Sequence, residues 1–180
     1  MIFSLARRPL PALALLLLPA LGAQAEEATP VSLPVGASAL QETYEDWQVS
    51  CAGQGATKHC ALTQQQADGK TRQRMLAIEL HAAHDDKASG ILVLPFGLAL
   101  EKGVALQVDD ASPLPALHFR TCLPAGCLVP LAFDGAMLAA LRQGSTLKVK
   151  ASADGGAEAA FTISLKGFVS ALDRTAALAP

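Results

Sequence analysis

Four cysteines carry the clearest chemistry in this chain of 180 residues: Cys51, Cys60, Cys122 and Cys127. A zinc site is typically built from C-x-x-C knuckles, and a thioredoxin-type redox site uses the same short spacing. Here eight residues separate the first pair and four separate the second, so both kinds of site fit poorly. An even number of cysteines favours structural disulfides in an oxidising compartment, and four cysteines allow three pairings.

Local pairing is the arrangement that we predict among these three. Each cysteine pair brackets a short, turn-like loop: Gly53, Gln54 and Gly55 lie in the first, and Leu123-Pro124-Ala125-Gly126 is the second. Cysteines that face each other across the mouth of a hairpin can meet the Cα separation of about 5.5 Å that a disulfide needs. The sequence therefore predicts the bonds Cys51–Cys60 and Cys122–Cys127.

One cluster has side chains suited to a metal, namely His81-Ala82-Ala83-His84-Asp85-Asp86. Imidazole and carboxylate groups are ligands for zinc or copper. However, His81 and His84 are three residues apart, so a strand would place them on opposite faces. We interpret the segment as a polar loop and predict no metal site.

No local catalytic signature is present, because neither G-x-S-x-G nor H-E-x-x-H occurs. His59 lies beside Cys60, but a disulfide would consume that thiol. Paired carboxylates for glycoside cleavage stand about 5–9.5 Å apart in space, which sequence spacing does not determine. We therefore predict no catalytic residue and no cofactor, with a hydrolase of envelope polymers using a dispersed site as the alternative.

Residues 1–25 have the pattern of a secretory signal peptide. Arg7 and Arg8 give a charged head, Leu10 to Leu21 is uncharged, and Ala23-Gln24-Ala25 offers small residues for cleavage. The apolar run is shorter than the roughly 20 residues that span a bilayer. We expect cleavage near Ala25 and a periplasmic, secreted or cell-surface location.

The remaining 155 residues suit one domain. Without Arg7 and Arg8 the chain keeps 12 Lys and Arg against 16 Asp and Glu, so its net charge is −4. A mildly acidic chain has no electrostatic reason to bind nucleic acid. No basic run favours an anionic membrane surface, and no second stretch is a candidate transmembrane segment.

Alternation of apolar and polar residues recurs along the chain and predicts half-buried β-strands. Turn signals such as Asp68-Gly69-Lys70 and Asp154-Gly155-Gly156 separate the alternating segments. These segments, together with the solid apolar run at 91–94, are 47–51, 76–81, 104–109, 117–120, 147–150 and 161–166.

Two segments have helical periodicity instead. Asp134 is a suitable N-cap for a helix over Gly135 to Gln143, with Gly144 as its stop. A second short helix is predicted from Phe168 to Thr175. The expected fold is mainly β: an antiparallel β-sandwich or flattened barrel of about eight strands with two short helices.

The expected domain organisation has four parts. After the signal peptide, residues 26–42 hold two prolines and no clear period, which predicts a flexible N-terminal arm. A single disulfide-bearing β domain is then expected over residues 43–177. The last residues, 178–180, are expected to be a frayed tail.

A series of short motifs runs in order through the predicted domain. It begins with 44–51 (YEDWQVSC) and Cys60, continues with 94–100 (LPFGLAL), Gly126 and Cys127, and ends with 165–168 (LKGF). Together these motifs resemble the invasion-associated locus B family of exported bacterial proteins. The resemblance implies a periplasmic or surface-exposed β domain, and a link to host-cell entry for some members. It brings no catalytic residues.

Physically, the motifs are interpreted as framework. Trp47 is predicted to be buried at the start of a strand, Pro95 and Gly97 to end a strand, and Gly167 to turn a strand into a helix whose Phe168 packs back. Function would then lie on loops, for which we select Ala52–His59 and His81–Ser89. The expected partner is an unidentified envelope or host-surface component; the sequence predicts no oligomeric state.

Overall fold

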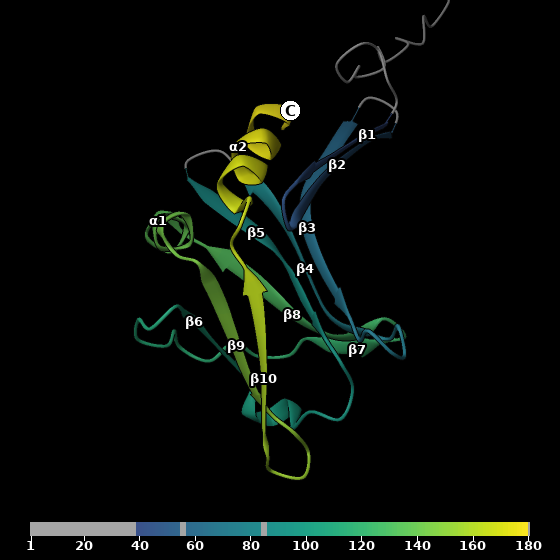
Figure 1. The fold of residues 1–180 in the computed structure, drawn as a ribbon, viewed down its shortest axis with the longest axis vertical. Helices are drawn as coiled ribbons and strands as arrows, with labels where there is room; N and C mark the ends of the chain where they lie inside the picture. The colour runs from purple at the N-terminus through teal and green to yellow at the C-terminus, as the bar shows by residue number, and fades with distance from the viewer. Residues whose placement is uncertain (1–38, 55–56, 84–85, 180) are drawn as a thin grey trace, which may run out of the picture.

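The structure is a computed structural model that describes residues 39–54, 57–83 and 86–179. In this part of the chain, ten strands form two antiparallel sheets (Figure 1). The larger sheet has the order β1-β2-β3-β4-β5-β8-β7, and the smaller has the order β10-β9-β6. The strands are β1 Ala39–Tyr44, β2 Trp47–Gln54, β3 Thr57–Ala67, β4 Arg74–Ala83, β5 Lys87–Leu94, β6 Val104–Val108, β7 Thr121–Leu123, β8 Gly126–Phe133, β9 Thr146–Ser152 and β10 Glu158–Ser164.

The core lies between the two sheets, because alternate residues of each strand point toward the other sheet. From the larger sheet, Leu62, Ile78 and Leu92 are at most 1% exposed, and Val149 and Ile163 of the smaller sheet are fully buried. The mainly β fold and its antiparallel sheets are confirmed, and of the two expected architectures the observed one is two packed sheets.

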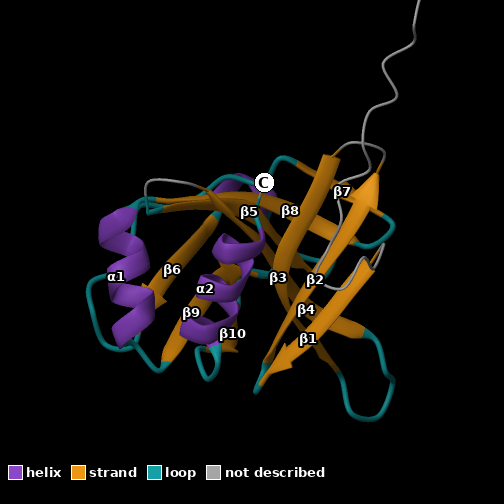
Figure 2. Cartoon of the chain, turned by 90° about the horizontal axis from the view of Figure 1, so that it is seen from above, coloured by secondary structure: helices purple, strands orange, loops and turns teal. Residues whose placement is uncertain are grey.

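Helix α2, Phe168–Leu178, packs against β1 to β4 on the side of the larger sheet that faces the smaller one (Figure 2). The Phe168 ring meets the Trp47 ring edge-on at 5.2 Å between centroids, and both side chains are 1% exposed. The predictions that Trp47 is buried and that Phe168 packs back are confirmed. Arg174 also donates two hydrogen bonds to Glu42, which lowers the pKa of that carboxyl and ties the helix to β1.

Helix α1, Gly135–Gln143, has the predicted bounds. Asp134 is its N-cap, since its side chain accepts a hydrogen bond from the Met137 backbone N–H at 2.9 Å. A 3-10 helix, η2, spans Leu100–Lys102 and lies at the end of the molecule opposite α2 (Figure 1).

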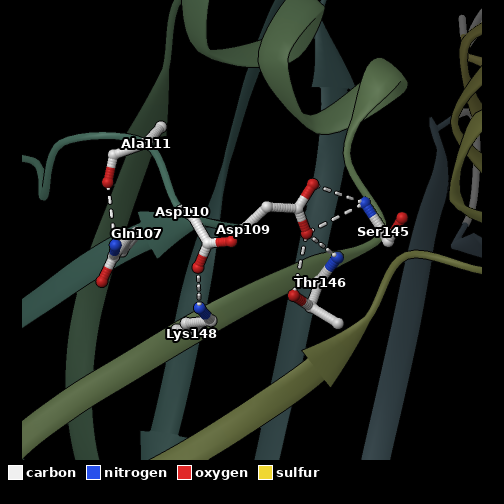
Figure 3. A network of polar contacts seen from close by, with 7 residues as sticks. All are labelled: Gln107, Asp109, Asp110, Ala111, Ser145, Thr146 and Lys148. Atoms are coloured by element: carbon white, nitrogen blue, oxygen red, sulfur yellow. Dashed lines mark hydrogen bonds and ion pairs between the residues drawn. The ribbon is translucent and has the colours of Figure 1, made fainter.

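The end of β6 is fastened to the start of β9 by Asp109 (Figure 3). Its carboxylate accepts hydrogen bonds from the backbone N–H groups of Ser145 and Thr146 and from the Thr146 hydroxyl, at 2.8 to 3.2 Å. These bonds, led by the Ser145 N–H, hold the pKa of Asp109 below its usual value. Beside it, Asp110 pairs with Lys148 and Gln107 donates to the Ala111 carbonyl.

Several strands differ from the sequence prediction. Segment 117–120 is not a strand; Leu117 makes one isolated bridge to Val104, because prolines at 113 and 115 interrupt the extended chain before it. Strands β1, β3, β7 and β8 lie outside the segments predicted as strands. Ten strands therefore replace the expected eight or so.

The domain boundaries also differ. Strand β1 begins at Ala39, inside the predicted arm, because residues 39–44 pair with β2 across a two-residue turn. At the other end, Leu178 belongs to α2 and is 4% exposed, so it is not part of a frayed tail. The predicted signal peptide and residues 26–38 lie outside the described residues. Within the described part of the chain, no helix is long and apolar enough to cross a membrane.

Candidate functional site

The two predicted surface loops are arms of neighbouring hairpins. Residues 52–59 belong mostly to β2 and β3, and residues 81–89 belong mostly to β4 and β5; positions 55–56 and 84–85 lie outside the described residues. Strand β3 pairs with β4 only from Leu62 and Leu80 onward, so the two hairpins separate beyond that pair. The interpretation of residues 52–59 and 81–89 as loops was therefore wrong, because most of them lie in strands. Residues of both segments nevertheless line one hollow.

A hollow of about 340 Å³ lies where the hairpins separate, and we call it the notch. The carboxyl end of α2 closes one side through Ala179, next to the place where the Cys60 sulfur lies 3.5 Å from the Leu178 carbonyl oxygen. The residues that line the notch are Thr57, Lys58, His59, Cys60, His81, Ala82 and Ala179.

His81 lines the notch and contacts one residue of β3 and one of β4. Its Nδ1 atom lies 3.0 Å from the Cys60 carbonyl oxygen, and its Nε2 atom lies 3.1 Å from a carboxylate oxygen of Glu79. Both neighbours are hydrogen-bond acceptors, and the tautomer of the ring decides which nitrogen donates.

A second hollow, of about 420 Å³, lies on the outer face of the larger sheet, the face turned away from the smaller sheet and both helices. We call it the groove. It shares His81 with the notch and has apolar and charged walls. Its lining residues are Glu79, His81, Ser89, Gly90, Ile91, Arg120, Leu128 and Leu131.

Strand register explains how distant segments build the groove. Ile91 of β5 stands opposite Glu79 of β4 on one side and opposite Pro130 of β8 on the other. Arg120 immediately precedes β7, and its backbone N–H donates to the Leu128 carbonyl at 2.8 Å. An arginine from one edge and a histidine–glutamate pair from the centre thus flank an apolar floor. Such an arrangement suits contact with an amphipathic partner.

The four cysteines form the predicted local pairs in this structure. The Cys51–Cys60 bond joins β2 to β3 and the Cys122–Cys127 bond joins β7 to β8. Each pair stands directly opposite in its hairpin, with Cα atoms 4.1 and 3.9 Å apart. All four sulfurs are bonded, so none of them is a thiolate nucleophile.

Only part of the candidate metal-binding segment lies within the described residues. His81 lies in β4 rather than in a loop, Asp86 follows the turn with a φ of +51°, and His84 and Asp85 lie outside the described residues. Among the residues that the structure describes, no three His, Cys, Asp or Glu side chains are grouped as metal ligands.

The selected segment Ala52–His59 contains Lys58, which is half-buried in the notch. Sequence reasoning did not select Arg120, which is exposed at the groove. Arg120 has no distinctive local pattern, because it contributes one charge from a segment remote from the other groove residues. Its place depends on strand pairing, which a single sequence does not display.

Residues 47–176 match the model of a family described as invasion associated locus B protein. An invasion protein B homolog of Brucella abortus strain 2308 is 49% identical over 148 residues, which cover 82% of this chain and 85% of that protein. Invasion protein B of Bartonella bacilliformis is 35% identical over 150 residues, covering 82% and 80% of the two chains.

A solved structure gives the same result for the fold. The crystal structure of invasion associated protein B from Bartonella henselae superposes with a TM-score of 0.72 at 36% identity. The match covers 77% of this chain and 96% of that one. The likeness therefore extends over the two-sheet domain and not over one motif alone.

Proposed function

This chain belongs to the invasion associated locus B family, and from that premise we propose that it is an exported, non-catalytic binding protein of the bacterial envelope or cell surface. Its partner would be a component of the envelope or of a host-cell surface. The observation that carries the proposal is the pair of adjoining hollows, notch and groove, which open on the rim and outer face of a sheet whose other face is filled by the core.

Three features support binding over catalysis. Both hollows are open, and their charged residues are spread along the walls rather than converging on one point. The four bonded cysteines do not present a ready thiolate nucleophile. The two antiparallel sheets, by contrast, provide a rigid frame for surface residues that read a partner.

Export is supported by the sequence of residues 1–25 and by the disulfides, which form and persist in oxidising compartments. These two features together support a periplasmic or cell-surface location.

Binding of the purified chain Glu26–Pro180 to envelope and host-cell surface fractions tests the proposal. Lys58→Glu in the notch and Arg120→Glu in the groove should each weaken saturable binding. Lys150→Glu is the matched control, since Lys150 is an exposed cation on β9 of the smaller sheet. Stability should change by less than about 0.5 kcal/mol in Arg120→Glu and Lys150→Glu, because both side chains are exposed. Lys58 is half-buried, so thermal unfolding of Lys58→Glu verifies that its fold is intact.

The hydrolase alternative gives a different result in the same preparation. Turnover of a peptidoglycan, glycan or ester substrate that is abolished by His81→Ala would replace the binding proposal with an enzyme. If the chain bound to none of the fractions in a saturable way, that result would also count against the binding proposal.

A further inference from the structure

Large apolar side chains are exposed at one end of the larger sheet. Met75 is 41% exposed, Phe96 is 62% exposed and Leu123 is 49% exposed. Single exposed apolar residues are ordinary, but a group of them at one place marks a contact surface. We call these three residues the apolar tip.

Strand register brings the three together. Leu94, the last residue of β5, pairs with Cys127, and Leu123 pairs with Gly126 next to it, so the β7–β8 turn lies at the end of β5. Phe96 follows β5 by two residues. Ala77 pairs with Val93, so Met75 belongs to the same end of the neighbouring strand. The tip thus adjoins the groove, which shares Leu128 with the same β7–β8 hairpin.

The tip is held by a rigid frame. The Cys122–Cys127 bond closes the hairpin that carries Leu123. A Cβ atom added at Gly126 would lie 2.5 Å from the Leu94 carbonyl oxygen, so the hairpin packs directly on β5. On the other side of Phe96, the Gly97 carbonyl accepts a hydrogen bond from the Asp154 N–H at 2.9 Å, and Leu98 bridges to Ala153. The apolar side chains therefore project from fixed backbone.

Cations surround this end of the sheet. Lys70 and Arg72 lie in the turn between β3 and β4, and Arg74 begins β4; all three are exposed and have no ion pair among the described residues. The acid of that turn, Asp68, is engaged by the backbone N–H groups of Lys70 and Thr71 and by the Thr71 hydroxyl.

Other charges at this end of the sheet have both signs. Arg120 lines the groove together with Glu79, Lys102 and Glu101 lie in η2, and the Asp154 backbone N–H donates to the Gly97 carbonyl. The three unpaired cations beside Met75 are therefore the charge feature of the tip, on a chain whose overall charge is negative.

We propose that the apolar tip docks onto a lipid bilayer surface that carries anionic headgroups. Met75, Phe96 and Leu123 would enter the boundary between headgroups and acyl chains, and Lys70, Arg72 and Arg74 would contact the headgroups. A fluid apolar phase accepts protruding side chains without preformed pockets, whereas a protein partner would need a pocket for each. The inference rests on the proposed function, because it names the class of envelope component met at one end of the binding face.

Sedimentation with vesicles tests the apolar contribution. The chain Glu26–Pro180 should bind vesicles of phosphatidylglycerol and phosphatidylethanolamine, and should bind vesicles of phosphatidylcholine weakly. The double variant Phe96→Ser/Leu123→Ser should lose about tenfold in partitioning for each apolar side chain removed. Val169→Ser is the matched control, because Val169 is 37% exposed on α2, remote from the tip, and its loss should change binding less than about twofold.

A second pair of variants tests the charges. Arg72→Glu/Arg74→Glu should weaken binding to the anionic vesicles, and added salt should weaken binding of the unaltered chain in the same way. Lys150→Glu serves as the charge control. Thermal unfolding of each variant verifies that the surface substitutions leave the fold intact.

The outcomes separate this inference from the proposed function. Saturable binding to a protein-containing envelope or host-surface fraction, with no binding to anionic vesicles, would overturn the lipid inference and leave the proposed function standing. Vesicle binding that survives Phe96→Ser/Leu123→Ser, or that Val169→Ser abolishes equally, would also overturn it. If the unaltered chain bound neither the protein-containing fractions nor the anionic vesicles, both the proposed function and the lipid inference would be refuted.

Discussion

Asp109 shows how one side chain can join two strands. The Asp109 backbone has a φ of +46°. Its carboxylate accepts hydrogen bonds from the Ser145 and Thr146 N–H groups, which hold β9 beside the end of β6. Asn adopts this left-handed conformation as readily as Asp does. Asp109→Asn therefore removes the charge while keeping the backbone geometry, and we expect a lower melting temperature at neutral pH.

The pH dependence of that loss has a definite sign. The pKa of Asp109 is lowered by folding from its usual 3.8, so its ionised form stabilises the folded chain above pH 3.8. That stabilisation should disappear as the pH falls through the lowered pKa. Melting curves of both chains from pH 7 downward should converge in acid, while Asp110→Asn, whose partner is Lys148 alone, should cost less at neutral pH. A constant difference at every pH would argue against the charge as the cause.

Three aromatic residues show how far the sequence predicts which side chains are buried and which are exposed. Burial of Trp47 and Phe168 followed from their places beside a strand start and a glycine turn, and the structure confirms both. Phe96 lies in an equally recognisable motif and was assigned to the framework, yet it is 62% exposed. Local pattern locates the end of β5 correctly, but the exposure of Phe96 depends on which segments cover it, and that is a tertiary property.

At the scale of elements, α2 depends on the turn that starts it. Gly167 has a φ of +79°, and a Cβ atom there would lie 2.0 Å from the Tyr44 carbonyl oxygen. We expect Gly167→Ala to cost about 3 kcal/mol or more, since left-handed strain and overpacking add. Gly156→Ala is the matched comparison: its φ is +88° with open space around it, so only about 1–2 kcal/mol of strain applies. Urea unfolding measures both, and equal losses would show that the contact with Tyr44 is relieved elsewhere.

The two disulfide hairpins give a second prediction at this scale. Cys51→Ala/Cys60→Ala and Cys122→Ala/Cys127→Ala should each lower the free energy of unfolding by about 2–3 kcal/mol, because short closed loops constrain the unfolded chain modestly. Urea unfolding of the unaltered chain with and without reductant is the control. Peptide mapping without reduction tests the pairing itself, and a Cys51–Cys122 bond would refute the local arrangement.

Strand prediction failed where polar residues face inward or where pairing is needed to define a strand. In β3, Gln64 is 6% exposed and bonds to both backbone groups of Ser164 across the sheets, so the expected alternation is hidden. Strand β1 has no strong pattern and is defined by its pairing with β2. Strand β8 contains Pro130, which is accommodated where β7 has already ended.

At the scale of the whole molecule, function depends on which segments the two sheets bring together. The notch combines β3, β4 and the end of α2, and the groove combines β4, β5, β8 and the residue before β7. Sequence analysis selected the segments Ala52–His59 and His81–Ser89, which meet at the notch, but it interpreted them as loops. It could not assemble the whole groove or the apolar tip, because their residues are separated by tens of positions and share no pattern.

Residues 1–25 predict that the whole chain leaves the cytoplasm. Ala23-Gln24-Ala25 follows the apolar run of the leader, so the exported protein should begin at Glu26. Both disulfides then form in an oxidising environment, and the exported protein should show no thiol reactive toward an alkylating reagent after unfolding without reductant. The same chain produced from residue 26 in a reducing cytoplasm should instead show all four cysteines alkylated and should unfold at lower urea concentration, because both cross-links are missing. N-terminal sequencing and mass measurement of the two preparations check these expectations. A start at Met1 or well beyond Thr29, or free thiols in the exported protein, would contradict them.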